Sequence, residues 1–285
     1  MLYNAGLVLE GGGMRGVYTA GVLDFFLDKE IEFKSCYGVS AGAAHLCSYI
    51  SKQHGRAFHV CVDYLDDKNY CSSYSLLTTG DLFNVEMCYD RIPNELLPYD
   101  YETAATYPGK AYAVVTNIET GQPEYMRLRD LHKDIIAVRA SCSLPLISRN
   151  VPIDGKWYLD GGISDSIPIQ KSILSGNRKN IVVLTKEEGY RRKPSTQLGL
   201  MKVKYARYPK VHELMKNRHT TYNKTLDYLD AQVENGQAFV IRPKKDIGVG
   251  RVEKDKSKLE ALYRNGYEDA RGCYEQMMMY LNGNV

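Results

Sequence analysis

Two glycine-rich turns, each between a short apolar run and a helical pattern, limit the fold more than any other feature of the chain. The first run, residues 5–9, is followed by the turn 11–16 and then by apolar residues at helical spacing over 17–27. The second run, residues 33–39, is followed at Ser40 by a segment rich in alanine and glycine. Two strand-turn-helix units within 55 residues predict an α/β fold with a mainly parallel sheet.

The rest of the chain continues this plan, without an internal repeat or a low-complexity linker. We expect a three-layer α/β/α fold with a central mostly parallel sheet, formed by a single domain over residues 1–285. Its core would cover about residues 5–185, and residues 186–285 would form a basic, mostly helical part. The further expected elements are strands at 111–118, 123–128, 151–153, 157–159, 180–185 and 238–241, and helices at 130–142 and 256–281.

Composition excludes several classes of protein. The 285 residues are 44% hydrophobic and 25% charged, which is ordinary globular usage. No apolar run reaches the roughly 18 residues that span a bilayer, and no signal-peptide pattern is visible at the N-terminus. The 7 cysteines are odd in number and show no CxxC or other metal-ligand spacing. We therefore expect free thiols, no metal and a cytoplasmic location.

Positive charge is concentrated in the last third of the chain. Residues 1–185 carry 17 Lys and Arg against 21 Asp and Glu, whereas residues 186–285 carry 20 against 13. This excess is too mild for a dedicated nucleic-acid binder. Within residues 186–224, tyrosines alternate with 11 Lys and Arg against 3 acidic residues. Such a stretch is typical either of a solvated face or of peripheral contact with an anionic membrane on its inner face.

The sharpest local motif is Gly38-Val39-Ser40-Ala41-Gly42, a GxSxG sequence between a predicted strand and a predicted helix. In this context the serine lies on a strained turn, and small neighbours let the chain segments approach while the hydroxyl stays accessible. The N-terminus of the following helix favours developing negative charge. The pattern alone also occurs by chance, so the strand-turn-helix context carries the interpretation of Ser40 as a nucleophile.

The first glycine turn admits two functional interpretations. Gly11, Gly13 and Gly16 satisfy the dinucleotide pattern GxGxxG, which would favour a nucleotide-binding oxidoreductase. That pattern also requires a carboxylate at the end of the second strand, and the second strand ends at Ser40 instead. Alternatively, consecutive glycines such as Gly12 and Gly13 can direct backbone amides at one point, as an oxyanion hole requires.

A third signal is Asp160-Gly161-Gly162, which follows the apolar end of a predicted strand. The motif displays a carboxylate at a strand end, on a turn of flexible backbone. Taken alone it is most simply a turn, because Asp-Gly is a common turn dipeptide.

In this order, the motifs GGGxRG, GxSxG and DGG resemble the patatin-like phospholipase family. The segment 139–145, RASCSLP, is similar to a family segment as well, and the resemblance covers about residues 5–185. The C-terminal hundred residues are similar to a bacterial subgroup of this family, notably at Arg218-His219 and Tyr222-Asn223.

The resemblance implies a lipid acyl hydrolase, of phospholipase A or lysophospholipase type, that uses a Ser-Asp dyad on a lipid ester without a cofactor. By position in the motifs, Ser40 matches the nucleophile and Asp160 the base, and Arg15 matches the basic residue of the oxyanion loop. Burial would raise the pKa of the aspartate and make it a better base. Val39 departs from the pattern, since many members have threonine there. The residues that match the family motifs are Gly11, Gly12, Gly13, Arg15 and Gly16 in the oxyanion loop, Gly38 and Gly42 around the serine, and Gly161 and Gly162 after the aspartate.

Two further alternatives stay open from the sequence. A Ser-Asp-His triad in this chain order needs a histidine after Asp160, and only His212 and His219 qualify. Both lie in a basic segment that predicts a helix rather than a loop after a late strand. The remaining histidines, which all fall in predicted helices, are His45, His54, His59 and His132. A catalytically silent lipid-binding protein would keep the same fold without turnover.

Overall fold

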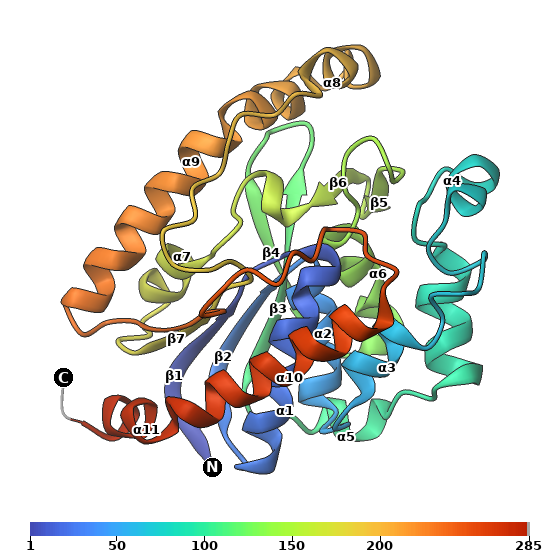
Figure 1. Ribbon diagram of the computed structural model, residues 1–285. Coiled ribbons are helices and arrows are strands. Elements are labelled where there is room, and N and C mark those ends of the chain that lie inside the picture. The colour runs from blue at the N-terminus through green and yellow to red at the C-terminus, as the bar shows by residue number, and fades with distance from the viewer. Residues whose placement is uncertain (284–285) are drawn as a thin grey trace.

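The computed structural model describes residues 1–283 and is built around a mixed eight-stranded sheet (Figure 1). Along the sheet the order is β5 (Val151–Ile153), β6 (Lys156–Asp160), β3 (Lys110–Asn117), β2 (Glu32–Val39), β1 (Leu2–Leu9), β7 (Asn180–Val183) and β8 (Phe239–Ile241), with β4 (Pro123–Leu128) paired to β3. Strands β1, β2, β3, β7 and β8 form the parallel part, while β4 and β6 run antiparallel to β3, and β5 antiparallel to β6.

Helices cover both faces of the sheet and give the expected three layers (Figure 1). Alternation along β1 explains why both faces are apolar: Leu7 and Leu9 pack into the larger core, and Val8 packs into a second core on the other face. On the larger core lie α1 (Val17–Asp28), α2 (Ala41–Ile50), α3 (Arg56–Val62), α6 (Leu131–Ser141) and α10 (Lys256–Gly272). On the second core lie α7 (Ile169–Leu174) and α9 (Pro209–Glu234).

Several elements differ from the sequence-based expectations. The segment between α3 and β3 contains α4 (Ser73–Thr79), the π-helix η2 (Met87–Leu96) and α5 (Tyr101–Ala105), for which the sequence had supplied no prediction. His54 was expected in a helix but lies in the turn before α3, where Gly55 has a φ of 75°. Glycine allows the chain to reverse there, because a side chain would strain this left-handed conformation.

The single helix expected over residues 256–281 is instead two helices, α10 and α11 (Tyr274–Asn282). They meet at Cys273, whose backbone leaves the helical region, next to Gly272, a residue of low helix propensity. The break lets the Tyr274 ring meet the Phe25 ring edge-on, with 5.6 Å between centroids.

The crossing of α1 and α10 ties the C-terminal part to the main core. Two glycines make the crossing close: an added Cβ on Gly21 would lie 2.0 Å from the Tyr263 carbonyl oxygen, and one on Gly266 would lie 2.0 Å from the Tyr18 carbonyl oxygen. The Tyr18 hydroxyl also donates a hydrogen bond to Asp269 on α10, at 3.1 Å. Helix α10 is therefore an integral part of the layer that contains α1.

We predict that Gly266→Ala lowers the free energy of unfolding by about 1–3 kcal/mol, the usual cost of overpacking a tight contact. Gly199→Ala is the matched control, because Gly199 is also helical but has open space around it. That control should stabilise the protein by up to about 1 kcal/mol. Urea denaturation measures both changes, and equal effects of the two substitutions would contradict the packing argument.

Candidate active site

Strand β3 brings Ser40 and Asp160 together, although 120 residues separate them in the chain. Strand β2 pairs with β3 up to the Val39–Val114 pair and then ends at Ser40. On the next residue of β3, strand β6 pairs Asp160 with Val115. One edge of β3 therefore serves two strands in succession. The ends of those strands meet head to head, and Ser40 and Asp160 line the same small cavity.

Ser40 lies on the strained turn that the GxSxG motif predicts. Its φ of 54° and ψ of −123° fall outside the regions that side chains favour, at a cost of order 1–3 kcal/mol. Gly38 and Gly42 make the turn possible: an added Cβ on Gly38 would lie 2.6 Å from the Ala43 Cα, and one on Gly42 would lie 2.6 Å from the Leu9 carbonyl oxygen. The surrounding structure fixes the serine in place.

A part of that surrounding structure is the segment 139–145. The Ser40 amide donates to the Ser141 hydroxyl at 2.8 Å, and this hydroxyl donates to the Val114 carbonyl oxygen at 2.6 Å. The Asp160 amide donates to the Ser143 carbonyl oxygen at 2.8 Å. One segment thus holds both candidate residues by their backbones. The segment 139–145 is similar to a family segment, but its sequence predicted no role for Ser141 or Ser143.

Asp160 is a buried carboxylate that keeps one oxygen available. Its Oδ1 accepts the Gly162 amide at 2.7 Å, whereas its Oδ2 accepts no hydrogen bond of ordinary geometry from residues 1–283. Burial raises the pKa of Asp160, and Arg218, the nearby Ser40 hydroxyl and the Gly162 amide act in the opposite direction. The available oxygen and the raised pKa are what a general base for Ser40 requires.

The glycine turn closes over Ser40 as an oxyanion loop would. An added Cβ on Gly11 would lie 2.8 Å from the Ser40 Cβ, and one on Gly16 would lie 2.6 Å from the Ala41 Cβ. Gly13 has a φ of 59° and begins the short helix η1 (Gly13–Gly16). Within residues 1–283, neither the Gly12 nor the Gly13 amide donates a hydrogen bond. Both amides therefore lack a hydrogen-bond acceptor in this part of the structure.

The cavity that Ser40 shares with Asp160 is small and polar, with a volume of about 20 Å³. The glycines of both predicted loops contribute to its wall, since Gly11, Gly12, Gly13 and Gly162 all line it. Gly161 lies behind that wall, where an added Cβ would be 2.1 Å from the Val114 carbonyl oxygen. Four arginines complete the lining, namely Arg15, Arg192, Arg218 and Arg251.

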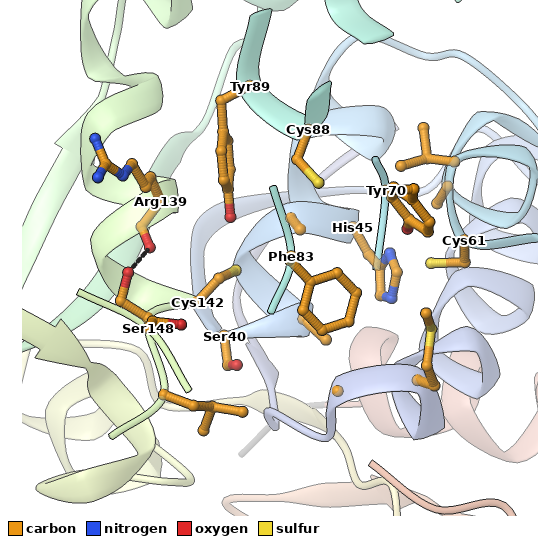
Figure 2. A pocket seen from close by; sticks show the side chains of 18 of the residues that line it. Ser40, His45, Cys61, Tyr70, Phe83, Cys88, Tyr89, Arg139, Cys142 and Ser148 are labelled. Carbon is orange, nitrogen blue, oxygen red and sulfur yellow. Dashed lines mark hydrogen bonds between the residues drawn. The ribbon is translucent and has the colours of Figure 1, made fainter. Parts of the chain in front are cut away.

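Ser40 also lines a second, larger cavity of about 140 Å³, which is mainly apolar (Figure 2). Alanines from α2 and α3, Phe83 and Tyr89 contribute to it, as do three cysteines, Cys61, Cys88 and Cys142. Burial raises the pKa of the Cys61 thiol to about 12, so this thiol stays neutral. The cavity therefore suits an alkyl chain that ends at the Ser40 hydroxyl.

Within residues 1–283, no histidine forms a hydrogen bond to the side chain of Ser40 or Asp160. His212 and His219 lie on α9, as the helical pattern predicted, and neither lines a cavity with Ser40. His45 on α2 does line the apolar cavity, but within residues 1–283 its ring forms no hydrogen bond to the Ser40 hydroxyl. Burial lowers the pKa of His45 to about 4, which leaves a neutral ring at physiological pH.

A buried carboxylate that the sequence analysis missed supports the glycine turn. Glu10, at the end of β1, accepts the Tyr222 hydroxyl at 2.6 Å on one oxygen, and the Thr185 amide at 2.7 Å on the other. The Thr185 side chain in turn contacts Gly12, where an added Cβ would lie 3.0 Å from its hydroxyl. The glutamate directly before the glycines was the only sign of this support in the sequence. Its role could not be predicted, because its partners are about 175 and 212 residues further along the chain.

Two kinds of site are not found within residues 1–283. No group of three or more histidine, cysteine, aspartate or glutamate side chains is placed to hold a metal ion. No helix in this range is both long and apolar enough to cross a bilayer.

Comparison with known families and structures identifies two regions. Residues 7–172, more than half of the chain, match the model of the patatin-like phospholipase family. Residues 208–282 match a domain of unknown function, DUF6363. By fold, 95% of the chain superimposes on 67% of VipD from Legionella pneumophila, with a TM-score of 0.51 and 13% identity.

Similar proteins occur in bacteria, animals and viruses. The uncharacterized protein YjjU of Escherichia coli is 33% identical over 63% of this chain and 51% of its own length. The mouse 1-acylglycerol-3-phosphate O-acyltransferase Pnpla3 is 29% identical over 57% of this chain and 40% of its own length. A probable lipid hydrolase of Invertebrate iridescent virus 6 is 24% identical over 62% of this chain and 66% of its own length. The chain thus spans about half the length of these relatives.

We predict that Asp160→Asn raises the free energy of unfolding at pH 7. The pKa of Asp160 is raised in the folded state, so ionisation destabilises the fold, and this penalty grows as the pH rises through the folded-state pKa. Asparagine avoids the charge and can still accept the Gly162 amide. The gain should shrink towards pH 3, where the wild-type carboxyl is protonated in both states. Thermal melting across this range measures it, and a destabilised variant at pH 7 would contradict the argument.

Proposed function

Because the chain belongs to the patatin-like phospholipase family, we propose that it hydrolyses a carboxylic ester of a lipid through an acyl-serine intermediate at Ser40. One observation carries the proposal: Ser40 is shared by an apolar cavity and a small polar cavity that also contains Asp160 and the glycine turn. The first suits an acyl chain, and the second suits the reacting carbonyl and its charge.

The proposed reaction has two halves. In the first, Asp160 takes the Ser40 proton as the hydroxyl oxygen attacks the ester carbonyl carbon, and the amides near Gly12 and Gly13 hold the oxyanion. As the tetrahedral intermediate collapses, the bond to the leaving alcohol breaks and Asp160 returns the proton to that alcohol. In the second half, Asp160 deprotonates a water that attacks the carbonyl carbon of the acyl-serine. The bond from that carbon to the Ser40 oxygen then breaks, Asp160 returns the proton to the Ser40 oxygen, and the fatty acid is released.

An aspartate is a weak base for a serine, and the site compensates in two ways. Burial raises the pKa of Asp160, which strengthens it as a base. The oxyanion amides would supply much of the remaining stabilisation, since one such donor contributes about 3 kcal/mol. Arg218 and the Ser40 hydroxyl oppose the effect of burial, so the carboxylate can still ionise.

We predict that a fluorophosphonate probe labels Ser40 alone and that Ser40→Ala abolishes both labelling and ester hydrolysis. Ser48→Ala is the matched control, since Ser48 lines the same apolar cavity on the same helix. Peptide mapping of the adduct and hydrolysis of acyl esters of rising chain length provide the measurements. A catalytically silent lipid-binding protein would show no adduct, and an adduct on another serine would refute the assignment.

The role of Asp160 is tested separately from that of the histidines. Asp160→Asn should lose at least about a hundredfold in kcat, as expected when a general base is removed. His45→Gln, His212→Ala and His219→Ala should each retain most of the activity. A hundredfold loss in a well-folded His219→Ala or His45→Gln protein would replace the dyad with a mechanism that uses histidine.

We also propose that the basic stretch 186–224 docks on anionic lipid surfaces. Helix α8 (Leu198–Lys204) in this stretch has two exposed apolar side chains, Leu200 at 64% and Val203 at 79% exposure. Val203 lies between Lys202 and Lys204 in the sequence. Exposed apolar side chains among lysines suit an interface in which each basic residue contributes about 1 kcal/mol.

We predict that sedimentation with anionic vesicles exceeds that with neutral vesicles and falls steeply between 0.1 M and 1 M salt. Leu200→Ser combined with Val203→Ser should weaken docking at low salt. Leu174→Ser on α7 is the control, since Leu174 is equally exposed at 79% but lies outside the stretch. Binding that ignores lipid charge, salt and the α8 double variant would rule out this mode of docking.

A further inference from the structure

The C-terminal part of the chain supplies three arginines to the cavity of Ser40 and Asp160. Arg192 comes from the loop after β7, Arg218 from α9 and Arg251 from the loop before α10. Arg218 and Arg251 fall within residues 208–282, the region that matches a domain of unknown function. Among the described residues, the fourth arginine that lines this cavity is Arg15, which belongs to the glycine turn.

The same three arginines also line a wider groove next to this cavity. The groove has a volume of about 340 Å³, which gives it room for a substituent that the 20 Å³ cavity could not hold. Lys193 and His219 line it as well, and among residues 1–283 no carboxylate does. The groove and the cavity therefore share Arg192, Arg218 and Arg251 as lining residues.

Each of the three arginines contacts a neighbouring segment through its side chain or its backbone. The Arg192 guanidinium lies 4.2 Å from the centre of the Tyr222 ring, and its backbone exchanges two hydrogen bonds with the Asn223 side chain. The Arg218 Nε donates to the Gly162 carbonyl oxygen, and the Arg251 carbonyl oxygen accepts the Met14 amide at 3.0 Å. The guanidinium groups of Arg192 and Arg218 are thus positioned before any ligand arrives, and Arg251 is held through its backbone.

The arginines lack the counterions that such a cluster needs. Within residues 1–283, none of the four forms an ion pair with a carboxylate at 4.0 Å or less. Burial lowers the pKa of Arg218 to about 9, and repulsion from Arg192 and Arg251 acts in the same direction. Asp160 and Glu10 are the acidic groups that act on Arg218, and Glu10 already accepts hydrogen bonds from Tyr222 and Thr185. Positive charge therefore remains uncompensated beside Ser40.

We propose that Arg192, Arg218 and Arg251 bind a phosphomonoester carried by the substrate close to the scissile ester, so that residues 208–282 act as the head-group part of the site. A phosphomonoester has a charge of about −1.5 to −2 at pH 7 and three acceptor oxygens. It therefore matches an unpaired arginine cluster better than a neutral head group or a singly charged diester does. Only the location of the scissile ester rests on the function proposed above.

Binding of ether analogues tests this inference without turnover. The probes are 1-O-octylglycerol 3-phosphate, the same ether without phosphate, its phosphocholine diester, and inorganic phosphate, each titrated calorimetrically into the full chain. We expect the monophosphate ether to bind at least about thirtyfold more tightly than the other three. Arg192→Met and Arg251→Met should each weaken its binding about tenfold, as expected for loss of one charge-assisted contact.

Arg191→Met is the matched control. Arg191 lines the same groove, but its guanidinium lies 2.6 Å from an Asp227 carboxylate oxygen, so its charge is already paired. This variant should bind the monophosphate ether within twofold of wild type. Thermal melts confirm that each variant is folded, and Arg192→Met and Arg251→Met provide independent tests should one of them unfold.

Three results would overturn the inference. Equal affinity for the phosphorylated and plain ethers would exclude phosphate recognition, and equal affinity for the diester would exclude a monoester preference. Inorganic phosphate that binds as tightly as the monophosphate ether would identify a free anion rather than a head group as the ligand. Because ethers cannot be hydrolysed, tight and arginine-dependent binding would support the inference even if no ester were cleaved. Conversely, ester hydrolysis without that binding would be consistent with the proposed function and would exclude only the inference that the arginines bind a phosphomonoester.

Discussion

The succession of β2 and β6 on one edge of β3 is the constraint on which the rest of the site depends. If β2 extended one residue further, Ser40 would occupy the position on β3 that Asp160 now takes at Val115. The abrupt turn at Ser40 therefore does more than expose a hydroxyl. It also frees the edge of β3, and the antiparallel β6 enters that space with a carboxylate as its last residue. Both candidate residues owe their positions to hydrogen bonding in the sheet.

The C-terminal part completes this arrangement from outside the sheet. Helix α9 contacts the site through Arg218 at Gly162, Tyr222 at Glu10 and Asn223 at Arg192. These three residues lie within six positions of one another, so two turns of a single helix connect the Asp160 loop, the glycine turn and the loop after β7. The resemblance noted at Arg218-His219 and Tyr222-Asn223 thus falls on residues that contact the site.

The sequence was most informative where local patterns determine structure. Apolar runs and glycine turns predicted the α/β fold, and the turn at Ser40 has the strained backbone that GxSxG indicates. Hydrogen-bond partners that are distant in the sequence could not be predicted. For example, no local pattern around Ser141 shows that its hydroxyl bridges Ser40 and Val114. The arginines were visible only as excess charge, because their convergence depends on α9 and on the loop before α10. The pairing of Asp160 with β3 likewise depends on the tertiary fold.

The hydrogen bond from the Met14 amide to the Arg251 carbonyl oxygen has a consequence for the order of events during synthesis. The glycine turn leaves the ribosome before its backbone partner, which is made more than 230 residues later. Strand β1 likewise waits for β7 before its second edge is paired. A nascent chain that has already formed the turn at Ser40 still lacks the segment that supports the glycine loop. The backbone support of the glycine loop is therefore complete only after the segment around Arg251 has been made and has folded back onto Met14.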